Sequence, residues 1–392
     1  MSHTKDFKII ICGAGIAGLS AAIALRAEGR HITILERSSL AREIGATISL
    51  QPNASRIVQK EWNIDSLKEA NGTVDQGFRV FNESGDLVNK VALTAKTEYD
   101  GDRVCYHRQD LHACLLRTAT STERAGRPAE LKTSSKVVSC DCEQGVVTLE
   151  SGEQMTADLI VAADGIHSDL RKLVIDGDAA PIPTGFSAYR LMMPNAVLEE
   201  NASEFCSKIK PREPFTSMIV AHSCRLIMGS AREGELFSLV GLVPDERMNE
   251  DPGQHQSWVS KGDVNRMLET YKDFPEWIKD VFRQGLKPEY ELGLWQLRDL
   301  DPLKTWTKGR VILIGDAAHA MLPTQGQGAS QAVEDAEALG AFFDEFTEAP
   351  SAEQVKDTLQ RVSECRYERA SLIQKYSRES SKPAVEKGTV TL

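Results

Sequence analysis

The sequence lacks the features that mark several whole classes of protein. Its 392 residues hold 46 Lys and Arg against 57 Asp and Glu, a formal net charge of −11, so there is no basic excess. Proteins that bind nucleic acids or anionic lipid surfaces usually carry such an excess, and neither partner is expected. No apolar run reaches the roughly 18 residues of a membrane-spanning helix, and the first residues do not have the pattern of a signal peptide. The chain is therefore predicted to have no integral membrane segment.

Cysteine is sparse and scattered. Eight cysteines are spread over nearly the whole chain, whereas a disulfide framework is typical of short secreted chains with dense cysteine. The one close pair, Cys140 and Cys142, lacks the spacing of a metal-binding finger, and no metal site is predicted. Reduced thiols in a cytoplasmic protein are the favoured interpretation. The composition, 41% hydrophobic and 26% charged, is ordinary for a globular chain, and the length predicts two or three domains.

A glycine motif stands near the start of the chain. Gly13, Gly15 and Gly18 form G-x-G-x-x-G directly after an apolar, strand-like run at residues 8–12 and before a helix-like run. In this pattern the first glycine permits a tight turn, the second lets a pyrophosphate approach the backbone, and the third lets helix and strand pack closely. Glu36 ends the next predicted strand, where its carboxylate can bind a ribose hydroxyl. Together these residues predict a dinucleotide site.

A second group of small residues favours FAD over NAD as the dinucleotide. The predicted strand at 311–314 runs into Gly315 and Asp316, and a predicted helix begins near Gly328. Small residues let the backbone approach a ligand, and the Asp316 carboxylate can hold a hydroxyl of the ribityl chain. The N–H groups at the start of the helix can stabilise the negative charge of a reduced flavin. A plain NAD dehydrogenase would leave this segment without a role.

The order of the predicted elements indicates interleaved domains. Nucleotide-binding patterns occur at the start of the chain, at 159–165 and at 311–346, while the stretch 184–243 is typical of short antiparallel strands. We expect a FAD-binding domain, an inserted substrate-binding sheet and a C-terminal helix with a tail. The expected boundaries are residues 1–180 (including segments 1–60 and 100–180) and 286–350 for the FAD-binding domain, 181–285 for the sheet, and 351–392 for the helix and tail.

Three motifs in combination resemble the single-component FAD-dependent aromatic monooxygenases of the salicylate hydroxylase and 4-hydroxybenzoate hydroxylase type. They are the glycine motif at 13–18, Asp164-Gly165 within residues 161–171, and residues 315–336. The resemblance spans nearly the whole chain. It implies an α/β fold in which a Rossmann-like FAD-binding domain of the GR2 type carries an inserted, mostly antiparallel β-sheet substrate domain and is followed by a C-terminal helix.

The resemblance also implies which residues bind the cofactor. Glycine motif and Asp316 would hold the phosphates and ribityl chain of FAD, Glu36 the adenosine ribose, and Asp164 both FAD and NAD(P)H. The stretch 323–329 would lie beside the isoalloxazine ring. The residues expected to contact FAD are Gly13, Gly15, Ile16, Ala17, Gly18, Glu36, Arg37, Gly45, Ala46, Arg108, Asp164, Asp316, Pro323, Gly326, Gly328 and Ala329.

The implied activity is the insertion of one oxygen atom of O2 into an aromatic or polyketide-like small molecule. NADPH or NADH would reduce FAD, and a C4a-hydroperoxyflavin would donate its distal oxygen. Arg190 is the expected catalytic residue, as a stabiliser of an anion or phenolate, and its alternative is an ordinary arginine on a sheet surface. Many relatives place a tyrosine where Gly229 stands and an asparagine where Ser238 stands. This departure puts phenol deprotonation by tyrosine in doubt and points to a larger or non-phenolic substrate.

Two other functions stay open. A flavin enzyme of this kind could epoxidise or oxidatively rearrange a non-phenolic alkaloid or terpenoid scaffold. A flavoprotein with vestigial redox chemistry could instead serve in sensing or binding. Substrate-stimulated NADPH oxidation with an equal amount of oxygenated product would eliminate this last reading.

Overall fold

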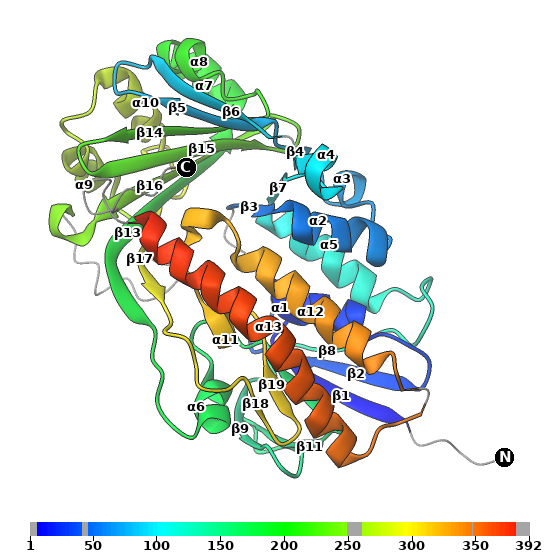
Figure 1. Ribbon diagram of the computed structural model, residues 1–392. Helices are drawn as coiled ribbons and strands as arrows, with labels where there is room; N and C mark the ends of the chain where they lie inside the picture. The colour runs from blue at the N-terminus through cyan, green and yellow to red at the C-terminus, as the bar shows by residue number, and fades with distance from the viewer. Residues whose placement is uncertain (1–5, 41–45, 94, 249–260, 347, 382–392) are drawn as a thin grey trace.

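A six-stranded sheet forms the centre of the nucleotide-binding half of the molecule (Figure 1). The computed structural model describes residues 6–40, 46–93, 95–248, 261–346 and 348–381. Neighbouring strands pair in parallel, apart from the antiparallel edge pair β18 and β19. The strand order is β18 (Thr307–Lys308), β19 (Val311–Leu313), β12 (Leu159–Ala162), β1 (Phe7–Cys12), β2 (Arg30–Leu35) and β8 (Glu130–Lys132).

Alternate side chains of this sheet enter two separate cores. Ile9 and Ile11 of β1 pack with α1 (Ile16–Ala24), α5 (Arg108–Thr120) and α12 (Gly328–Phe343). Ile10 and Cys12 point the other way and pack with α6 (Asp169–Ile175) and a three-stranded sheet. That sheet consists of β9 (Val137–Asp141), β10 (Val146–Leu149) and β11 (Gln154–Thr156). Because both faces are covered, the central strands β12 and β19 are apolar along their whole length, and β1 is apolar except at Lys8.

A seven-stranded sheet forms the other half of the molecule. Its pairs are antiparallel except β14 with β5, which is parallel. The strand order is β17 (Gly293–Asp299), β13 (Ile182–Pro194), β16 (Leu236–Pro244), β15 (Cys224–Ala231), β14 (Thr216–Ala221), β5 (Gly77–Phe81) and β6 (Leu87–Ala92). One face packs against α7 (Asn195–Asn201), α8 (Ser203–Ile209), α9 (Val264–Thr270) and α10 (Glu276–Gln284).

The opposite face of the seven-stranded sheet looks toward the nucleotide-binding half. Ala188, Leu242 and Trp295 on that face form a core with Leu322, which follows the six-stranded sheet in the chain. A small sheet of β3 (Thr47–Leu50), β7 (Val104–His107) and β4 (Thr73–Val74) adjoins it. The short elements are α2 (Pro52–Arg56), η1 (Ile57–Glu61), α3 (Ser66–Glu69), α4 (Ala95–Tyr99), η2 (Asp245–Arg247), α11 (Asp316–His319) and η4 (Pro323–Gln325).

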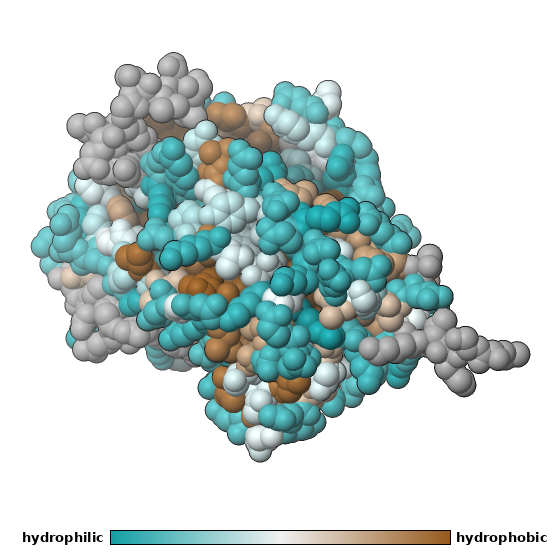
Figure 2. Space-filling model, turned by 60° about the horizontal axis from the view of Figure 1, so that its bottom comes forward, coloured by the Kyte–Doolittle hydropathy of each residue, from teal (hydrophilic) through white to brown (hydrophobic). Residues whose placement is uncertain are grey.

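The long helix α13 (Ala352–Ser381) crosses the molecule and reaches both halves (Figure 1). It packs along α12, and near its C-terminal end the Arg225 guanidinium of β15 donates to the backbone oxygen of Ser380 over 2.9 Å. No helix among the described ranges is long and apolar enough to cross a membrane. On the face shown in Figure 2, hydrophilic residues cover most of the surface and hydrophobic residues form separate patches.

The predicted fold class is confirmed, with a mostly parallel nucleotide-binding sheet, an antiparallel second sheet and a C-terminal helix. The expected domain boundaries stay a prediction. The antiparallel sheet takes β5 and β6 from residues 77–92 and β17 from 293–299, in addition to strands between 182 and 244. Alternation within short strands does not show which sheet a strand joins, because its partners lie far away in sequence.

Candidate active site

The glycine loop after β1 contains two glycines that the fold requires and one that it does not. A Cβ at Gly13, where φ is +108°, would lie 2.4 Å from the backbone oxygen of Ala163, and one at Gly18 would lie 1.9 Å from that of Gly13. A Cβ at Gly15 would meet no atom within 4 Å, and its φ of −75° suits any residue. Gly15 caps the N-terminus of α1, so the open space lies where helix N–H groups can bind a phosphate.

Glu36, at the end of β2, is bonded directly to this loop. The N–H of Ala14 donates to Glu36 Oε2 over 2.8 Å, and the N–H of Ser38 donates to Oε1 over 2.8 Å. His112 of α5 supports the loop from below through a 2.7 Å hydrogen bond between Nε2 and the backbone oxygen of Ala14. The carboxylate is thereby fixed beside the glycine loop, as the sequence predicts for a ribose-binding residue.

Two further loops, after β12 and β19, are tied together by Arg171. Its side chain is only 2% exposed. It donates to the backbone oxygens of Gly165 and Asp316 from Nη2, over 3.3 and 3.0 Å, and to that of Ala317 from Nε over 2.7 Å. The guanidinium therefore holds the Asp164 loop and the Asp316 loop in one arrangement.

The Asp316 turn is also held from behind by Asp335 of α12. Asp335 Oδ2 accepts from the N–H of Gly315 over 3.0 Å and lies 2.6 Å from His319 Nε2, while Oδ1 accepts from Arg366 Nε over 3.0 Å. Burial alone would raise the pKa of Asp335, but His319, Arg366 and the Gly315 N–H outweigh it and lower the pKa to about 2. The carboxylate is therefore ionised and fixes the turn that carries Asp316.

Asp316 itself faces a hollow between the two halves. Asp316 is accessible to solvent through the hollow, but many protein atoms surround its carboxyl. The loss of hydration that they cause raises the pKa of this carboxyl. It lines a cavity of about 90 Å³ together with Arg190 and Trp295 of the antiparallel sheet and Pro323 of η4. The predicted cofactor loop and the predicted substrate sheet therefore line the same cavity.

Arg190, on β13, lies over the face of an aromatic ring in this cavity. Its guanidinium carbon is 3.8 Å from the centre of the Trp295 ring, a cation–π contact. Burial, together with the nearby positive charge of Arg108, lowers the pKa of Arg190. Arg108, at the start of α5, also lies near Asp316, and its positive charge opposes the rise in the pKa of the Asp316 carboxyl. The cavity thus combines the Arg190 guanidinium with the Asp316 carboxyl, and the positive charge of Arg108 lies nearby.

The segment from η4 to α12 forms another side of the site. Pro323 lines the cavity, Gly326 adopts a left-handed conformation with φ +61°, and Gly328 begins the 16-residue helix α12. No side chain in the described part of the chain caps that helix N-terminus. Its free N–H groups and its dipole can stabilise negative charge, as expected of the residues predicted to flank a flavin ring.

The residues present fit a dinucleotide such as FAD. Asp164 Oδ1 is buried and has no hydrogen-bond partner among the residues that the structure describes, and burial raises the pKa of this carboxyl. A buried oxygen left unsatisfied costs free energy unless a ligand supplies the donor. A dinucleotide site also needs a path by which a phosphate can approach the backbone, and the open space at Gly15 provides one.

Most of the predicted cofactor residues lie around this site, and a few do not take a visible part in it. Arg37 follows Glu36, and its side chain is exposed. Ala46 is buried, and its backbone oxygen accepts from the N–H of Arg108 over 2.8 Å, so it holds the start of α5. Gly45 lies outside the described residues. Ile16, Ala17 and Ala329 belong to the first turns of α1 and α12, where Ala17 approaches Gly315.

Sequence reasoning missed Arg171 and Asp335 as positioning residues. Both stand inside motifs that the sequence singled out, residues 161–171 and 315–336, but each has a partner far away in the chain, the backbone oxygen of Asp316 for Arg171 and the Arg366 side chain for Asp335. The charge of these two residues was the available signal, since charged side chains are almost never fully buried unless they are paired. Among the residues that the structure describes, no three His, Cys, Asp or Glu side chains cluster so as to hold a metal ion.

The protein-family model described as "FAD binding domain" matches residues 6–220 and 294–369. Hispidin-3-hydroxylase of Neonothopanus nambi is 32% identical over 385 residues, covering 95% of this chain and 88% of the relative. 3-Hydroxybenzoate 6-hydroxylase 1 of Aquipseudomonas alcaligenes is 28% identical over 377 residues, covering 95% of this chain and 88% of the relative.

Solved structures show the same fold. A substrate complex of salicylate hydroxylase superposes with a TM-score of 0.78 at 26% identity, covering 98% of this chain and 92% of that one. CtdE in complex with FAD and a substrate superposes with a TM-score of 0.81 at 23% identity, covering 95% of this chain and 88% of that one.

Proposed function

The chain belongs to the FAD-binding-domain family and is an FAD-dependent monooxygenase, and on that premise we propose that it inserts one oxygen atom of O2 into an aromatic or polyketide-like small molecule at the expense of NADH or NADPH. FAD, when bound, supplies the electron transfer and the activation of O2. The cavity between the two halves carries the proposal. There Asp316, from the predicted cofactor loops, and Arg190, from the antiparallel sheet, line the same hollow.

The protein's own residues have three tasks in this proposal. The glycine loop, Asp164 and Asp316 hold the cofactor, with Arg171 and Asp335 positioning the loops that carry them. The uncapped N-terminus of α12 stabilises negative charge beside the bound cofactor. With cofactor and substrate bound between the two halves of the molecule, water would be excluded from the site, which would strengthen each of these electrostatic interactions.

Arg190 is proposed to stabilise negative charge that develops on the substrate. Its guanidinium lines the cavity and is oriented by the Trp295 ring beneath it. A preorganised cation in a desolvated cavity acts on developing charge more strongly than one in water. Arg108 adds a second positive charge nearby and so raises the affinity of the cavity for an anion.

The sheet face that continues from Arg190 has open space at Gly229, which supports the proposal of a substrate larger than a simple phenol. Gly229 of β15 pairs with Ser238 of β16, and a Cβ at Gly229 would meet no atom within 4 Å. A glycine inside a strand weakens the strand and often marks the close approach of a ligand. Ser238 is not available as a free polar group, since Thr47 Oγ1 donates to its Oγ over 3.1 Å.

Two relatives, hispidin-3-hydroxylase and 3-hydroxybenzoate 6-hydroxylase 1, are named as hydroxylases. The compound in the second name, 3-hydroxybenzoate, is aromatic, and this supports an aromatic substrate. Another relative, notoamide E oxidase of Aspergillus versicolor, is named as an oxidase; it is 29% identical over 382 residues. The space at Gly229 favours the second candidate function, epoxidation or oxidative rearrangement of a bulky non-phenolic scaffold, more than a small tyrosine-lined site would. Cytoplasmic location remains part of the same proposal.

The experiment that tests the proposal is a substrate screen on the purified holoenzyme. Phenols, polyketides and indole alkaloids are each added, and the oxidation of NADH and of NADPH is followed together with product analysis. An oxygenase responds to its substrate with faster oxidation of one nicotinamide and an equal amount of oxygenated product. Arg190→Ala lowers the substrate-stimulated rate more than the basal rate; an equal fall in both rates would make Arg190 merely structural.

A further inference from the structure

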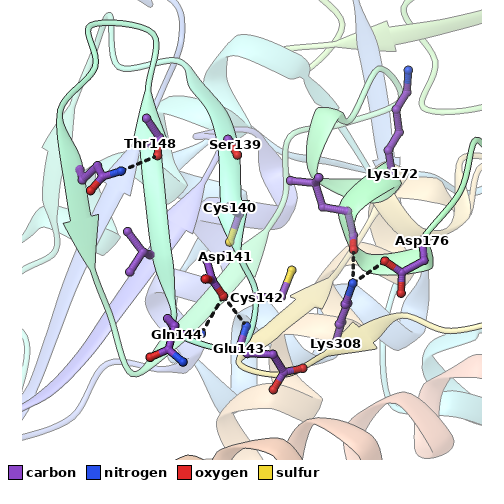
Figure 3. A pocket seen from close by; sticks show the side chains of 13 residues that line it. Ser139, Cys140, Asp141, Cys142, Glu143, Gln144, Thr148, Lys172, Asp176 and Lys308 are labelled. Atoms are coloured by element: carbon purple, nitrogen blue, oxygen red, sulfur yellow. Dashed lines mark hydrogen bonds and ion pairs between the residues drawn. The ribbon is translucent and has the colours of Figure 1, made fainter.

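A second hollow, of about 730 Å³, lies away from the cavity that holds Asp316 and Arg190 (Figure 3). It is formed by β9, the turn that follows it, α6 and the strand β18. Two thiols line it, those of Cys140 and Cys142, and the cationic side chains Lys172 and Lys308 line it as well. Figure 3 shows the Cys142 side chain between β9 and Lys308. None of these residues has a part in the proposed oxygenase site.

The two cysteines are close enough to interact directly. Both side chains line the same hollow and belong to the same core, and their residues are 9% and 6% exposed. Two residues of fully extended chain span at most about 7 Å, and disulfides form at Cα separations up to about 6.8 Å. Cys140 belongs to β9, which ends at Asp141, and Cys142 begins the turn that follows, so the two cysteines stand two residues apart at the end of one strand.

The surroundings make the two thiols unequal. The neighbouring Cys140 thiol, aided by the charge of Lys308, lowers the pKa of Cys142, whereas the neighbouring Cys142 thiol and burial raise the pKa of Cys140. Burial raises the pKa of Cys114 and Cys224, which lie in the other cores. One thiol of the pair is therefore the better nucleophile and the other keeps its proton, the usual division between an attacking and a resolving cysteine.

We propose that Cys140 and Cys142 form a redox-active dithiol site that hydrogen peroxide oxidises to a disulfide. The Cys142 thiolate attacks one peroxide oxygen, the O–O bond breaks, and a sulfenic acid and hydroxide result. The Cys140 sulfur then attacks the sulfenic sulfur and forms the S–S bond. The sulfenic hydroxyl leaves and, with the Cys140 proton, becomes water.

The dithiol site contacts segments that lead to the cofactor loops, so its oxidation can change the positions of these loops. The backbone oxygen of Cys142 accepts from the N–H of Arg310 over 2.8 Å, and Arg310 directly precedes β19, which leads to Asp316. Cys140 shares a core with Cys12, the last residue before the glycine loop. The turn at Cys142 is thus connected by one backbone hydrogen bond to the start of β19, the strand that leads to Asp316.

The test treats the holoenzyme with an equimolar amount of hydrogen peroxide, so that it does not depend on the proposed oxygenase activity. Trypsin releases residues 137–171, a peptide that contains Cys140 and Cys142 and no other cysteine. We expect this peptide to lose two hydrogens in mass, and a thiol reductant to restore them. The exposed Cys365 is the internal comparison, and we expect it to react about tenfold more slowly.

Three variants assign the roles. In Cys140→Ser, dimedone labels Cys142 as a sulfenic acid, because no resolving thiol remains. In Cys142→Ser, neither the disulfide nor a label at Cys140 forms. Cys365→Ser behaves like the wild type. Oxidation of Cys365 in the wild-type holoenzyme while the 137–171 peptide stays reduced would overturn the proposal without any variant, and a dimedone label at Cys140 in Cys142→Ser would overturn the assignment of the nucleophile.

Discussion

Arg171 Nη2 donates to the backbone oxygen of Asp316 over 3.0 Å, although the two residues stand 145 positions apart in the chain. The same guanidinium binds four more backbone oxygens, those of Gly165, Ile166, Ala179 and Ala317. A planar group with five donors in a fixed arrangement can serve several loops at once. The Asp164 loop and the Asp316 loop of the predicted cofactor site are thus joined by the buried Arg171 side chain.

Replacing Arg171 by lysine tests this joint. Lysine keeps the positive charge but cannot reach the separate carbonyl groups, so we expect a loss of about 3 kcal/mol in unfolding free energy and a clear fall in FAD content. Flavin absorbance per polypeptide and urea unfolding measure the two effects. Full FAD content in a stable Arg171→Lys protein would contradict the positioning role.

Gly15 and Gly18 should respond to the same substitution in opposite ways. Gly15→Ala places a methyl group in open space, so we expect normal stability but weakened FAD binding, because the methyl group occupies the approach of a phosphate. Gly18→Ala places it 1.9 Å from the backbone oxygen of Gly13 and should disrupt the fold itself. Thermal unfolding of both apoproteins, followed by FAD titration, separates the outcomes. An unchanged FAD affinity in Gly15→Ala would argue against a phosphate at this loop.

The stability of the protein should depend on the ionisation of Asp335. Its pKa is lowered to about 2 in the folded protein, against about 3.9 in an unfolded chain, so its stabilising effect is present above pH 4 and is lost as the pH falls toward 2. The effect amounts to about 2 kcal/mol. We expect Asp335→Asn to be less stable than the wild type at neutral pH, and the difference to narrow as the pH falls below 4. Urea unfolding across this range measures it; a constant difference would show that ionisation has no part.

Gly229 and Gly241 offer a matched pair for the substrate side. Gly229→Leu fills open space on the face toward the cavity, so we expect unchanged stability and FAD content but a roughly tenfold lower kcat/KM for bulky substrates. Gly241→Leu instead meets Tyr271 Oη 2.5 Å away and should lower the melting temperature. Unchanged selectivity in a folded Gly229→Leu enzyme would remove Gly229 from the substrate site.

The sequence predicts the local parts of this molecule well. The apolar runs at 8–12 and 311–314 and the glycine motif correspond to β1, β19 and the turn before α1. Between residues 264 and 284 the helical conformation is interrupted, since α9 ends at Thr270 and α10 begins after Pro275. Proline cannot continue a helix that precedes it, so this interruption follows from local chemistry.

What the sequence does not predict are contacts between distant segments. Neither the pairing of β17 with β13 nor the five carbonyl groups around Arg171 leaves a local periodic pattern. The same holds for the Trp295 ring beneath Arg190, since the two residues are brought together only by the pairing of their strands. Side-chain roles that depend on tertiary pairing therefore become visible only in the folded structure.

Isotope labelling tests the central claim most directly. The holoenzyme is supplied with NADH or NADPH, the compound that best stimulates its oxidation, and O2 enriched in oxygen-18, and the product is analysed by mass spectrometry. The account predicts one labelled oxygen atom in each product molecule, and none when the label is in water instead. A product without label, with the consumed O2 recovered entirely as hydrogen peroxide, would contradict it.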